Sequence, residues 1–397
     1  MRYRLFPGLL LAVLAMAPDN RALAAGPTTA PVQRPMVGYL SPADEAKTFV
    51  IQDDYQMELV LSDPLISDPV VTAFDGDGRM YVAEMRSFMR DADGSNERAK
   101  TGRISLHWSS KHNGVYDKHT VFVDNLLLPR MVLPLGDGIL VNETDTDDIW
   151  LYRDTKHKGV ADTKTLFYAG GPRGGNVEHQ PSGLIWDLDN WLYMAVNSYR
   201  LRIHGTNVIR EPTASNMGQW GLSQDDFGKL WFVNAGYEVG PLNFEEPIVY
   251  GAFNFAEQSE PDWPVVWPLL GLPDFQGGPV RIRPEQNSLN HFTATCGSEI
   301  YRGDRLPADL RGDLFFGEPV GRLIRRAKVE VKEGFTRVRN AYDQSEFIRS
   351  TDPNFRPVNL ANAPDGSMYI ADMYRGIIQE KDWVNRGSYL RGVVDQY

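Results

Sequence analysis

The chain has 397 residues and a formal net charge of −11, and 42% of its residues are hydrophobic. This length allows one large domain or two smaller ones with a sizeable core. The acidic balance argues against a nucleic-acid-binding protein, because no basic face would neutralise phosphates. The only cysteine, Cys296, leaves no internal disulfide, no cysteine zinc site and no C-x-x-C-H haem attachment motif in this chain. We expect its thiol to be buried as a small apolar group.

The first residues have the pattern of a secretory signal. Arg2 and Arg4 precede an apolar run, Leu5 to Ala17, that is short for a membrane span, and a small-x-small cleavage pattern ends at Ala24. We therefore expect a signal peptide over residues 1–24 and a periplasmic or secreted mature protein with no integral membrane span. An uncleaved anchor is the alternative.

Residues 25–50 are predicted to be a linker and an N-terminal extension. The linker, Gly26 to about Arg34, is rich in Pro, Thr and Ala, and Ser41-Pro42 is typical of a helix start with proline in the first turn. From Tyr55 to Leu61 the sequence is strand-like. A propeller domain is predicted over residues 51–397.

One phrase recurs along this domain: an apolar alternating run, a turn rich in Asp, Asn or Gly, and a second apolar run that carries an aromatic residue. This pattern predicts a β-hairpin. The four clear copies begin at Asp68, Gln180, Gly218 and Arg356, and weaker copies begin at Val132 and Arg311. Repeated hairpins favour an all-β, six-bladed β-propeller. A seven-bladed propeller and a pair of sandwiches are the alternatives.

Two further segments, from Ser109 and from Asp154, are similar to degenerate calcium loops. Basic residues stand where oxygen ligands would be expected, so tight glycine turns are the favoured interpretation. The segment from Ser350 to Tyr397 is predicted to end in a short helix or an irregular closing segment. A further interpretation is that the chain is a fragment of a longer protein.

The stretch from Asn176 to Ile203 carries a specific resemblance. His179-Gln180, then Gly183-Leu184, then a turn that ends at Tyr193 resemble the catalytic-histidine blade of the soluble quinoprotein glucose and sorbosone dehydrogenases. A closer resemblance, from Met36 to Tyr397, is to exported propellers of the membrane-bound dehydrogenase group. The shared phrases are MVGYLSPADEAKTFV, VEHQPSGL, YRGDRLPADLRGDLFFGEPVGR, EFIRSTDPNFRPVNL and DMYRGIIQE.

The resemblance implies a six-bladed propeller of the TolB or quinoprotein glucose dehydrogenase type that oxidises a sugar, polyol or alcohol. It implies pyrroloquinoline quinone (PQQ) and Ca²⁺ as cofactors and a c-type cytochrome or haem domain as the electron acceptor. His179 would be the base that takes the substrate proton. By position, Arg356 would bind the quinone.

In a propeller, residues at the inner strand ends converge on the central channel. We therefore expect Arg130 and Asp372 to join His179 as catalytic residues, and Gln180, Gln219 and Asn197 to join Arg356 in cofactor binding. No metal ligands are predicted.

The sequence also departs from the quinoprotein pattern. Asn216 stands at the position of one quinone-pairing arginine, Pro319 at that of the cofactor lysine, and the calcium-binding turn falls near 234–237 without its Gly-Pro. An anionic cofactor buried without cationic partners is costly. A non-redox lyase or hydratase with His179 as base, and a carbohydrate- or protein-binding propeller without chemistry, therefore remain as alternatives.

Overall fold

The computed structural model describes residues 38–53, 55–234, 242–243, 259–333 and 335–396. The predicted signal peptide and most of the predicted linker lie outside these residues, as does the calcium-like turn after residue 234. Antiparallel sheets dominate the described part, beside short helices such as α1 (Pro42–Glu45) and α2 (Tyr389–Val394). No helix in these ranges has both the length and the hydropathy needed to cross a membrane.

Each copy of the repeated phrase forms an antiparallel hairpin, which confirms the predicted turns. In the first copy, Phe74 pairs with Met80, and the Asp75 carboxylate accepts hydrogen bonds from the backbone N–H groups of Asp77 and Arg79. This is why an aspartate followed by glycine fixes the turn. The paired strands are β2 (Pro69–Phe74) with β3 (Met80–Glu84), β6 (Met131–Leu135) with β7 (Gly138–Asn142), β10 (Ser182–Trp186) with β11 (Leu192–Ala195), β14 (Ser223–Gln224) with β15 (Leu230–Phe232), β20 (Leu314–Glu318) with β21 (Leu323–Lys332), and β24 (Pro357–Asn362) with β25 (Met368–Asp372).

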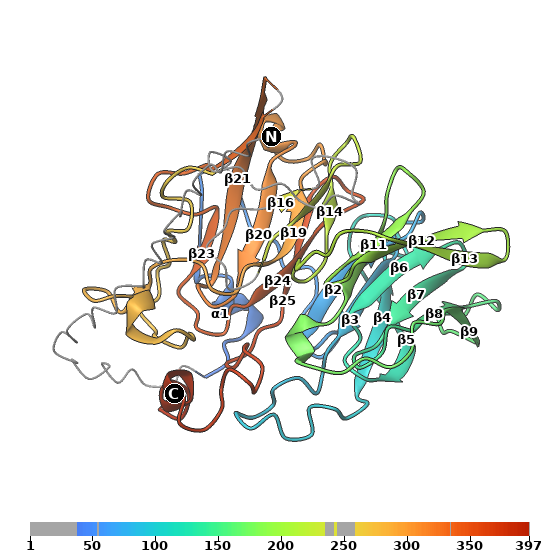
Figure 1. The fold of residues 1–397 in the computed structure, drawn as a ribbon, viewed down its shortest axis with the longest axis horizontal. Coiled ribbons are helices and arrows are strands. Elements are labelled where there is room, and N and C mark those ends of the chain that lie inside the picture. The colour runs from blue at the N-terminus through green and yellow to red at the C-terminus, as the bar shows by residue number, and fades with distance from the viewer. Residues whose placement is uncertain (1–37, 54, 235–241, 244–258, 334, 397) are drawn as a thin grey trace, which may run out of the picture. The chain divides into compact units, whose positions relative to one another are not determined.

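Outer strands extend several hairpins into four-stranded sheets in which chain neighbours are also sheet neighbours (Figure 1). The added strands are β4 (Gly102–Trp108), β5 (Lys118–Leu126), β8 (Ile149–Arg153), β9 (Thr163–Tyr168), β12 (Tyr199–His204) and β13 (Asn207–Pro212). Two smaller pairings are β16 (Leu242–Asn243) with β15, and β17 (Ile282–Arg283) with β18 (Ser288–Leu289).

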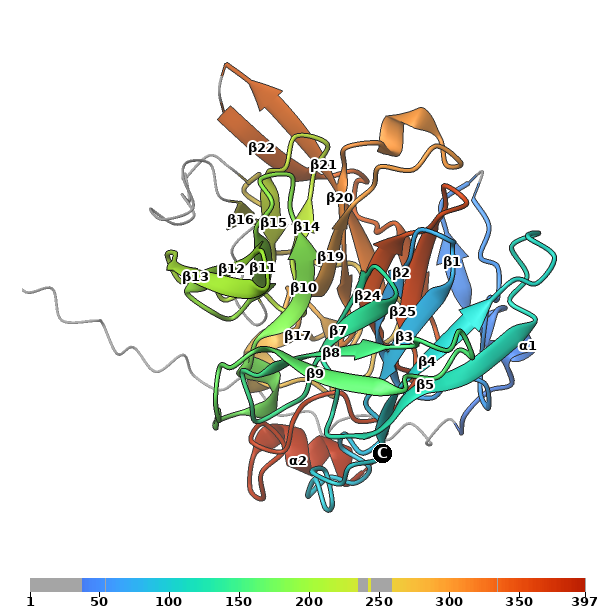
Figure 2. The ribbon, with the colours of Figure 1, turned by 90° about the vertical axis from the view of Figure 1, so that its right-hand side faces the viewer.

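The innermost strands of the sheets pack against one another in succession, and Figure 2 labels β2, β10, β14, β19 (Cys296–Ile300) and β24 of this set. β2 packs against β6 and β24, β6 packs against β10, and β19 packs against β14 and β24. Between β10 and β14 the backbones approach closely: a Cβ on Gly183 would lie 2.3 Å from the Cα of Gly221. Apolar layers fill the space between sheets, for example Met131 and Leu140 against Leu184. This arrangement is a β-propeller, as the sequence predicts.

The sheet that contains the copy at Arg311 is built differently from the others. Its innermost strand is β19, so the β20–β21 hairpin lies one strand further out than the other hairpins. Both β22 (Phe335–Asn340) and β23 (Ile348–Ser350) pair with β21. The sheet ends on β1 (Phe49–Ile51), which comes from before the first repeat and pairs with β23.

Outside the repeats, the sequence predictions had mixed outcomes. The helix start at Ser41 is confirmed, since its side chain accepts a hydrogen bond from the backbone N–H of Asp44 at 3.2 Å. The strand predicted from Tyr55 to Leu61 is wrong: the segment is not a strand, and Leu59 is 64% exposed. Its strand-like residues have no sheet edge to pair with. The predicted short helix near the end of the chain is α2.

Gly297 allows the innermost strands β19 and β24 to approach each other. Its φ is +62°, and a Cβ there would lie 2.3 Å from the carbonyl oxygen of Val358. We expect Gly297→Ala to lower the free energy of unfolding by about 3 kcal/mol, because the strands must separate and alanine disfavours this φ. Denaturant unfolding measures this. Gly312→Ala is the control: its φ is +87° with nothing within 4 Å, and we expect a loss of only about 1 kcal/mol. Equal losses for the two variants would contradict the explanation.

Candidate functional site

A cavity of about 440 Å³ lies where the inner ends of the sheets meet. Its wall is mostly apolar, with a small set of polar side chains, which is the usual make-up of a small-molecule site. The polar lining residues are Glu178, His179, Gln219, Gln276, Arg281, Thr293 and Gln379. The apolar lining residues are Val70, Met85, Phe88, Met217, Trp220, Ala294, Cys296, Pro319, Val358, Met373, Ile378 and Trp383. The thiol of Cys296 is free and buried, as predicted.

His179 reaches the cavity from a single turn of 3₁₀ helix, η1 (Val177–His179). The Asn176 side chain caps this turn by accepting a hydrogen bond from the backbone N–H of Glu178 at 2.7 Å. From the other side, the buried Arg130 guanidinium donates to the carbonyl oxygens of Val177 at 2.8 Å and Gln180 at 3.3 Å. The position of His179 is therefore set by residues that do not line the cavity themselves.

The His179 ring has the protonation state that a general base needs. Burial, and then the positive charge of Arg130, lower the pKa of His179, so the ring is neutral at neutral pH. Its nearest aromatic neighbour is Trp383, with ring centroids 6.2 Å apart in an edge-to-face arrangement. Among the described residues, no side chain or backbone group hydrogen-bonds to the ring. A nitrogen lone pair is thus available to a ligand.

Glu178 is a site residue whose role the sequence analysis missed. Its carboxylate accepts hydrogen bonds from the backbone N–H of Glu380 at 2.7 Å and from the indole N–H of Trp383 at 2.8 Å. Burial is the main cause that raises the pKa of Glu178 to about 7. Its position next to His179 in the sequence was a signal that Glu178 lies near the site. The partners in the 380–383 segment lie some 200 residues away, so the sequence did not show them.

Buried carboxyl groups give the protein a predictable pH dependence. Burial raises the pKa of Glu97 to about 7, of Glu178 to about 7 and of Glu299 to about 8. The folded state therefore keeps protons that the unfolded chain releases above about pH 4.5. Stability from this source is complete below the unfolded pKa and is lost as the pH rises through 7 to 8.

We expect the free energy of unfolding to fall by on the order of 2 kcal/mol between pH 6.5 and 8.5. His107, whose pKa burial lowers to about 4, titrates below this range. Denaturant unfolding at constant ionic strength measures the change. Glu299→Gln should reduce the slope, because glutamine does not titrate, and its amide oxygen can still accept from Asn362. A rise in stability over this range would contradict the prediction.

Several polar atoms of the cavity wall have no hydrogen-bond partner within the described ranges. The Thr293 hydroxyl and the Gln276 side-chain oxygen are buried without a hydrogen bond. The Gln219 side chain is 4% exposed and has no hydrogen-bond partner in the described part of the chain. A buried polar group without a partner is costly, so these atoms fit a ligand that supplies the missing hydrogen bonds.

Of the predicted site residues, His179 and Gln219 line the cavity and the other five do not. Arg130 braces η1, and its guanidinium lies 4.6 Å from the Trp220 ring centroid. Gln180 is buried and hydrogen-bonds to Asp145 through both side-chain atoms. The backbone oxygen of Asn197 accepts from Asn216, while its own side-chain nitrogen is buried without a partner.

The side chains of Arg356 and Asp372 make hydrogen bonds to other parts of the propeller. The Arg356 guanidinium is fully buried and donates to the carbonyl oxygens of Arg375 and Pro319, each at 2.9 Å, and to Asp274 at 2.9 Å. Asp372 accepts from the backbone N–H groups of Arg356 and Tyr374, and burial raises its pKa to about 6. Their predicted roles at a cofactor and in catalysis stay predictions, but these contacts are structural ones.

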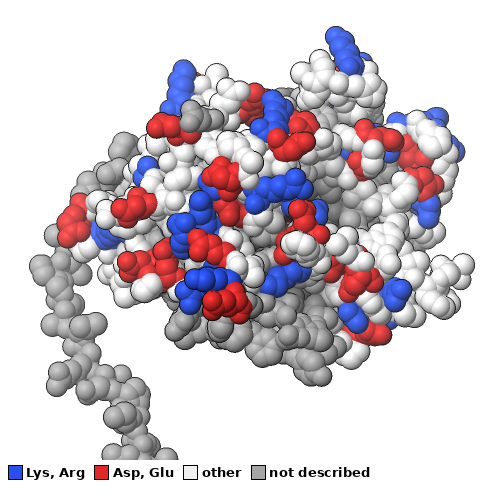
Figure 3. Space-filling model, turned by 90° about the horizontal axis from the view of Figure 1, so that it is seen from above, with Lys and Arg blue, Asp and Glu red and all other residues white. Residues whose placement is uncertain are grey.

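The cavity wall does not fit a quinone that carries several carboxylates. Arg281 is the only cation among the described lining residues, and its guanidinium donates to the carbonyl oxygen of Phe292 at 2.8 Å. Asn216 is buried and hydrogen-bonds to the backbone of Val196 and Met194, and Pro319 supplies an apolar surface. No group of three or more His, Cys, Asp or Glu side chains in the described ranges is placed to hold a metal ion. Figure 3 shows acidic and basic side chains interleaved on one outer face.

Solved structures are similar to this chain at low sequence identity. A protein of carbohydrate-active enzyme family AA12 from Trichoderma reesei has a TM-score of 0.50 and 14% identity, over 83% of this chain and 96% of that one. The PQQ domain of a pyranose dehydrogenase from Coprinopsis cinerea has a TM-score of 0.47 and 11% identity, over 83% and 95%. An inactive virginiamycin B lyase from Staphylococcus aureus has a TM-score of 0.39 and 12% identity, over 82% and 89%.

The match to the AA12 protein speaks for the fold and not for an activity, because the identity is only 14%. No curated protein matches the sequence. A family model does match it, from residue 41 to residue 397, over the whole propeller and the segment that follows. The chain therefore belongs to the family described as a domain of unknown function, DUF7133.

Proposed function

We propose that this chain is an enzyme that converts a small molecule in the central cavity, with His179 as the base that removes a proton. The observation that carries the proposal is a neutral histidine ring with no hydrogen bond among the described residues, on a turn that Arg130 and Asn176 hold at the cavity wall. A base that is already deprotonated and fixed in a mostly apolar cavity is suited to proton transfer.

The wall favours a neutral substrate with several hydroxyl groups, such as a sugar or a polyol. The unpaired atoms of Gln276 and Thr293, with the amide of Gln219, can exchange hydrogen bonds with hydroxyl groups. Trp220 and Trp383 offer apolar faces for the C–H side of such a molecule. An anionic substrate would find Arg281 as its cationic partner in the described wall.

An elimination or a hydration fits this wall best among the candidate reactions. His179 would take a proton from carbon, and the neighbouring oxygen would leave with a proton from solvent. Such a reaction needs no carboxylate-rich cofactor, in keeping with Arg281 as the one cation among the described lining residues. Oxidation of a sugar or alcohol, with electrons passed to a haem protein, is the second candidate. It rests on the quinoprotein resemblance of the His179 blade.

We further infer six blades, from the ring of innermost strands β2, β6, β10, β14, β19 and β24. Export to the periplasm or the outside of the cell is also proposed, on the pattern of residues 1–24. A c-type cytochrome partner belongs to the oxidation candidate alone.

A substrate panel separates these candidates. The purified chain is incubated with sugars, polyols and their acids, and substrate loss is followed by proton NMR without additives. Parallel samples contain PQQ, Ca²⁺ and a redox dye. Conversion without additives would support elimination or hydration. Dye reduction that requires PQQ and Ca²⁺ would support oxidation and overturn our preferred reaction. The proposal of an enzyme fails if no compound is converted and none shifts the melting temperature.

A further inference from the structure

One cavity wall is formed by a segment that is distant in sequence from the His179 turn. We call residues 377–396 the strap. It supplies Ile378, Gln379 and Trp383 to the cavity lining, and α2 lies within it. Its Trp383 ring is 36% exposed and stands edge-to-face with the His179 ring. The strap therefore contributes the surface next to the proposed base.

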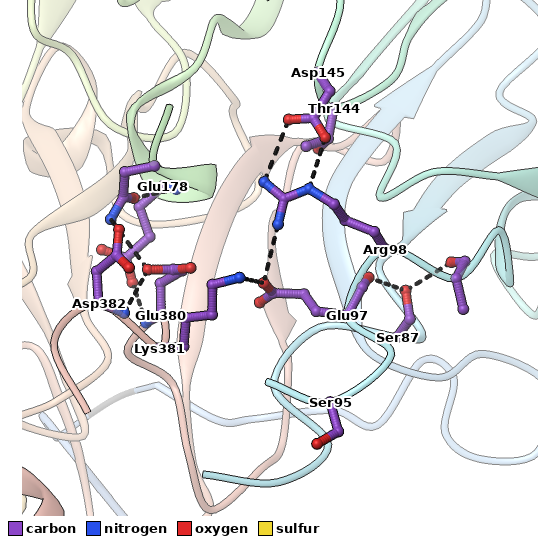
Figure 4. Close-up of polar contacts among 12 residues, drawn as sticks. Ser87, Ser95, Glu97, Arg98, Thr144, Asp145, Glu178, Glu380, Lys381 and Asp382 are labelled. Carbon is purple, nitrogen blue, oxygen red and sulfur yellow. Dashed lines mark hydrogen bonds and ion pairs between the residues drawn. The ribbon is translucent and has the colours of Figure 1, made fainter. Parts of the chain in front are cut away.

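Glu178 joins the strap to the turn that carries His179. One carboxylate oxygen accepts the Glu380 backbone N–H at 2.7 Å, and the other accepts the Trp383 indole N–H at 2.8 Å. Figure 4 shows Glu178 directed toward Glu380 and Asp382 of the strap. Hydrogen bonds that a carboxylate accepts are stronger than those between neutral groups. Both bonds end on strap atoms, so one side chain fixes the strap in two places.

Other contacts also hold the strap: the Gln379 side chain donates to the carbonyl oxygen of Asp274 at 2.9 Å, and Val384 and Leu390 are buried in the core. Asn176 donates to Glu380 at 3.1 Å and to Asp382 at 3.2 Å. Lys381 approaches the buried Glu97 only to 4.0 Å (Figure 4). At the far end of the strap, Arg391 pairs with the exposed Asp93 at 2.7 Å. Of these contacts, those of Glu178 alone reach the indole that faces His179.

We propose that Glu178 is a positioning residue, which holds Trp383 and the strap beside His179 and thereby sets how far this ring is open to solvent. The role of His179 as a base rests on the proposed function. The solvent accessibility of its ring can be measured whether or not that function is correct. Without Glu178, the indole N–H and the Glu380 N–H lose their acceptor. The Trp383 side chain is then free to turn away from His179, while the buried Val384 and Leu390 keep the rest of the strap in place.

Diethyl pyrocarbonate, which acylates neutral imidazole, tests the proposal without a substrate. The labelling rate of His179 is measured by peptide mass spectrometry at pH 7.5, with the exposed His112 and His157 as internal standards. We expect Glu178→Ala to raise the His179 rate about tenfold relative to the standards, as the loss of two charge-assisted hydrogen bonds implies. An unchanged rate would overturn the proposal.

The pH profile of the same labelling is a second readout. Burial, and then Arg130, lower the pKa of His179 in the closed arrangement. Access to water removes much of the burial effect, so the labelling midpoint should move up toward 6.5 in Glu178→Ala. The charged groups around this ring and Glu178 are Arg130, Arg281, Glu97, Arg98, Glu380, Lys381 and Asp382. An unchanged pH midpoint of labelling would contradict the inference that Glu178 controls the burial of the His179 ring.

Two matched variants distinguish the proposed positioning role of Glu178 from a general loss of structure. Trp383→Phe keeps a ring beside His179 but removes one N–H donor, so we expect a rate increase of about threefold. Glu97→Gln neutralises a neighbouring buried carboxyl that has only the 4.0 Å contact with the strap, and we expect no change. If Glu178→Ala does not fold, Trp383→Phe against Glu97→Gln decides: equal rates would overturn the proposal. Failure of the substrate panel leaves this outcome intact.

Discussion

Replacing His179 by glutamine should lower the turnover of any substrate found in the panel by about 100-fold or more. The reason is that removal of a positioned general base typically costs two to four orders of magnitude in rate. Glutamine is of similar size and polar, so it can occupy the same place at the cavity wall, but it cannot accept a proton near neutral pH. Steady-state kinetics of both proteins measures the loss, which should appear in kcat.

The control for His179→Gln is Gln219→Ala, at a cavity residue to which we assign binding only. We expect that variant to raise KM more than it lowers kcat, because it removes hydrogen bonds made in ground and transition states alike. Melting temperatures within a few degrees of the natural chain would show that both variants fold. Turnover of His179→Gln within threefold of the natural chain would rule out His179 as the base.

Replacing Arg356 by methionine should lower the free energy of unfolding by about 4 kcal/mol. The guanidinium is fully buried and serves the carbonyl oxygens of Arg375 and Pro319 as well as Asp274. Methionine fills a similar volume but leaves these acceptors without donors, and buried acceptors without partners are costly. Denaturant unfolding measures the difference.

An exposed ion pair provides the comparison for Arg356→Met. Arg339 pairs with Glu330 at 3.0 Å, and 45% and 56% of these side chains are exposed. Arg339→Met should change the stability by less than about 1 kcal/mol, because exposed pairs contribute little. A loss for Arg356→Met as small as this would favour the predicted cofactor role over the scaffold role.

The fold could be predicted well because its signal is local. Each hairpin places the apolar runs and the turn residues within about 17 residues of sequence, and Asp75 shows how one side chain fixes such a turn. The failures came where pairing is not local. The run from Tyr55 to Leu61 has strand residues but no partner edge, and β19 is an inner strand without a hairpin phrase of its own.

The site was less predictable, since residue type does not reveal the direction of a side chain. Arg130 and Arg356 suit an anion as well as they suit buried carbonyl groups, and in both the guanidinium serves the scaffold. His179 and Gln219 were found because they stand at the start of a repeated phrase, just before the copy at Gln180 and within the copy at Gly218. Trp383 and Glu380 lie outside the repeated phrase, and they come close to Glu178 only when the chain is folded.

The pairing of β1 with β23 has a consequence for how the chain folds. Thr48 and Ser350, whose hydroxyl groups are 2.8 Å apart at this junction, are separated by 302 positions in the sequence. Sheets such as β2–β5 and β6–β9 can form as soon as their own residues have been synthesised, whereas this one requires both ends of the domain. Closing so long a loop is entropically slow. Until β1 is in place, β23 has an unpaired edge, which is the kind of surface through which strands of separate chains pair.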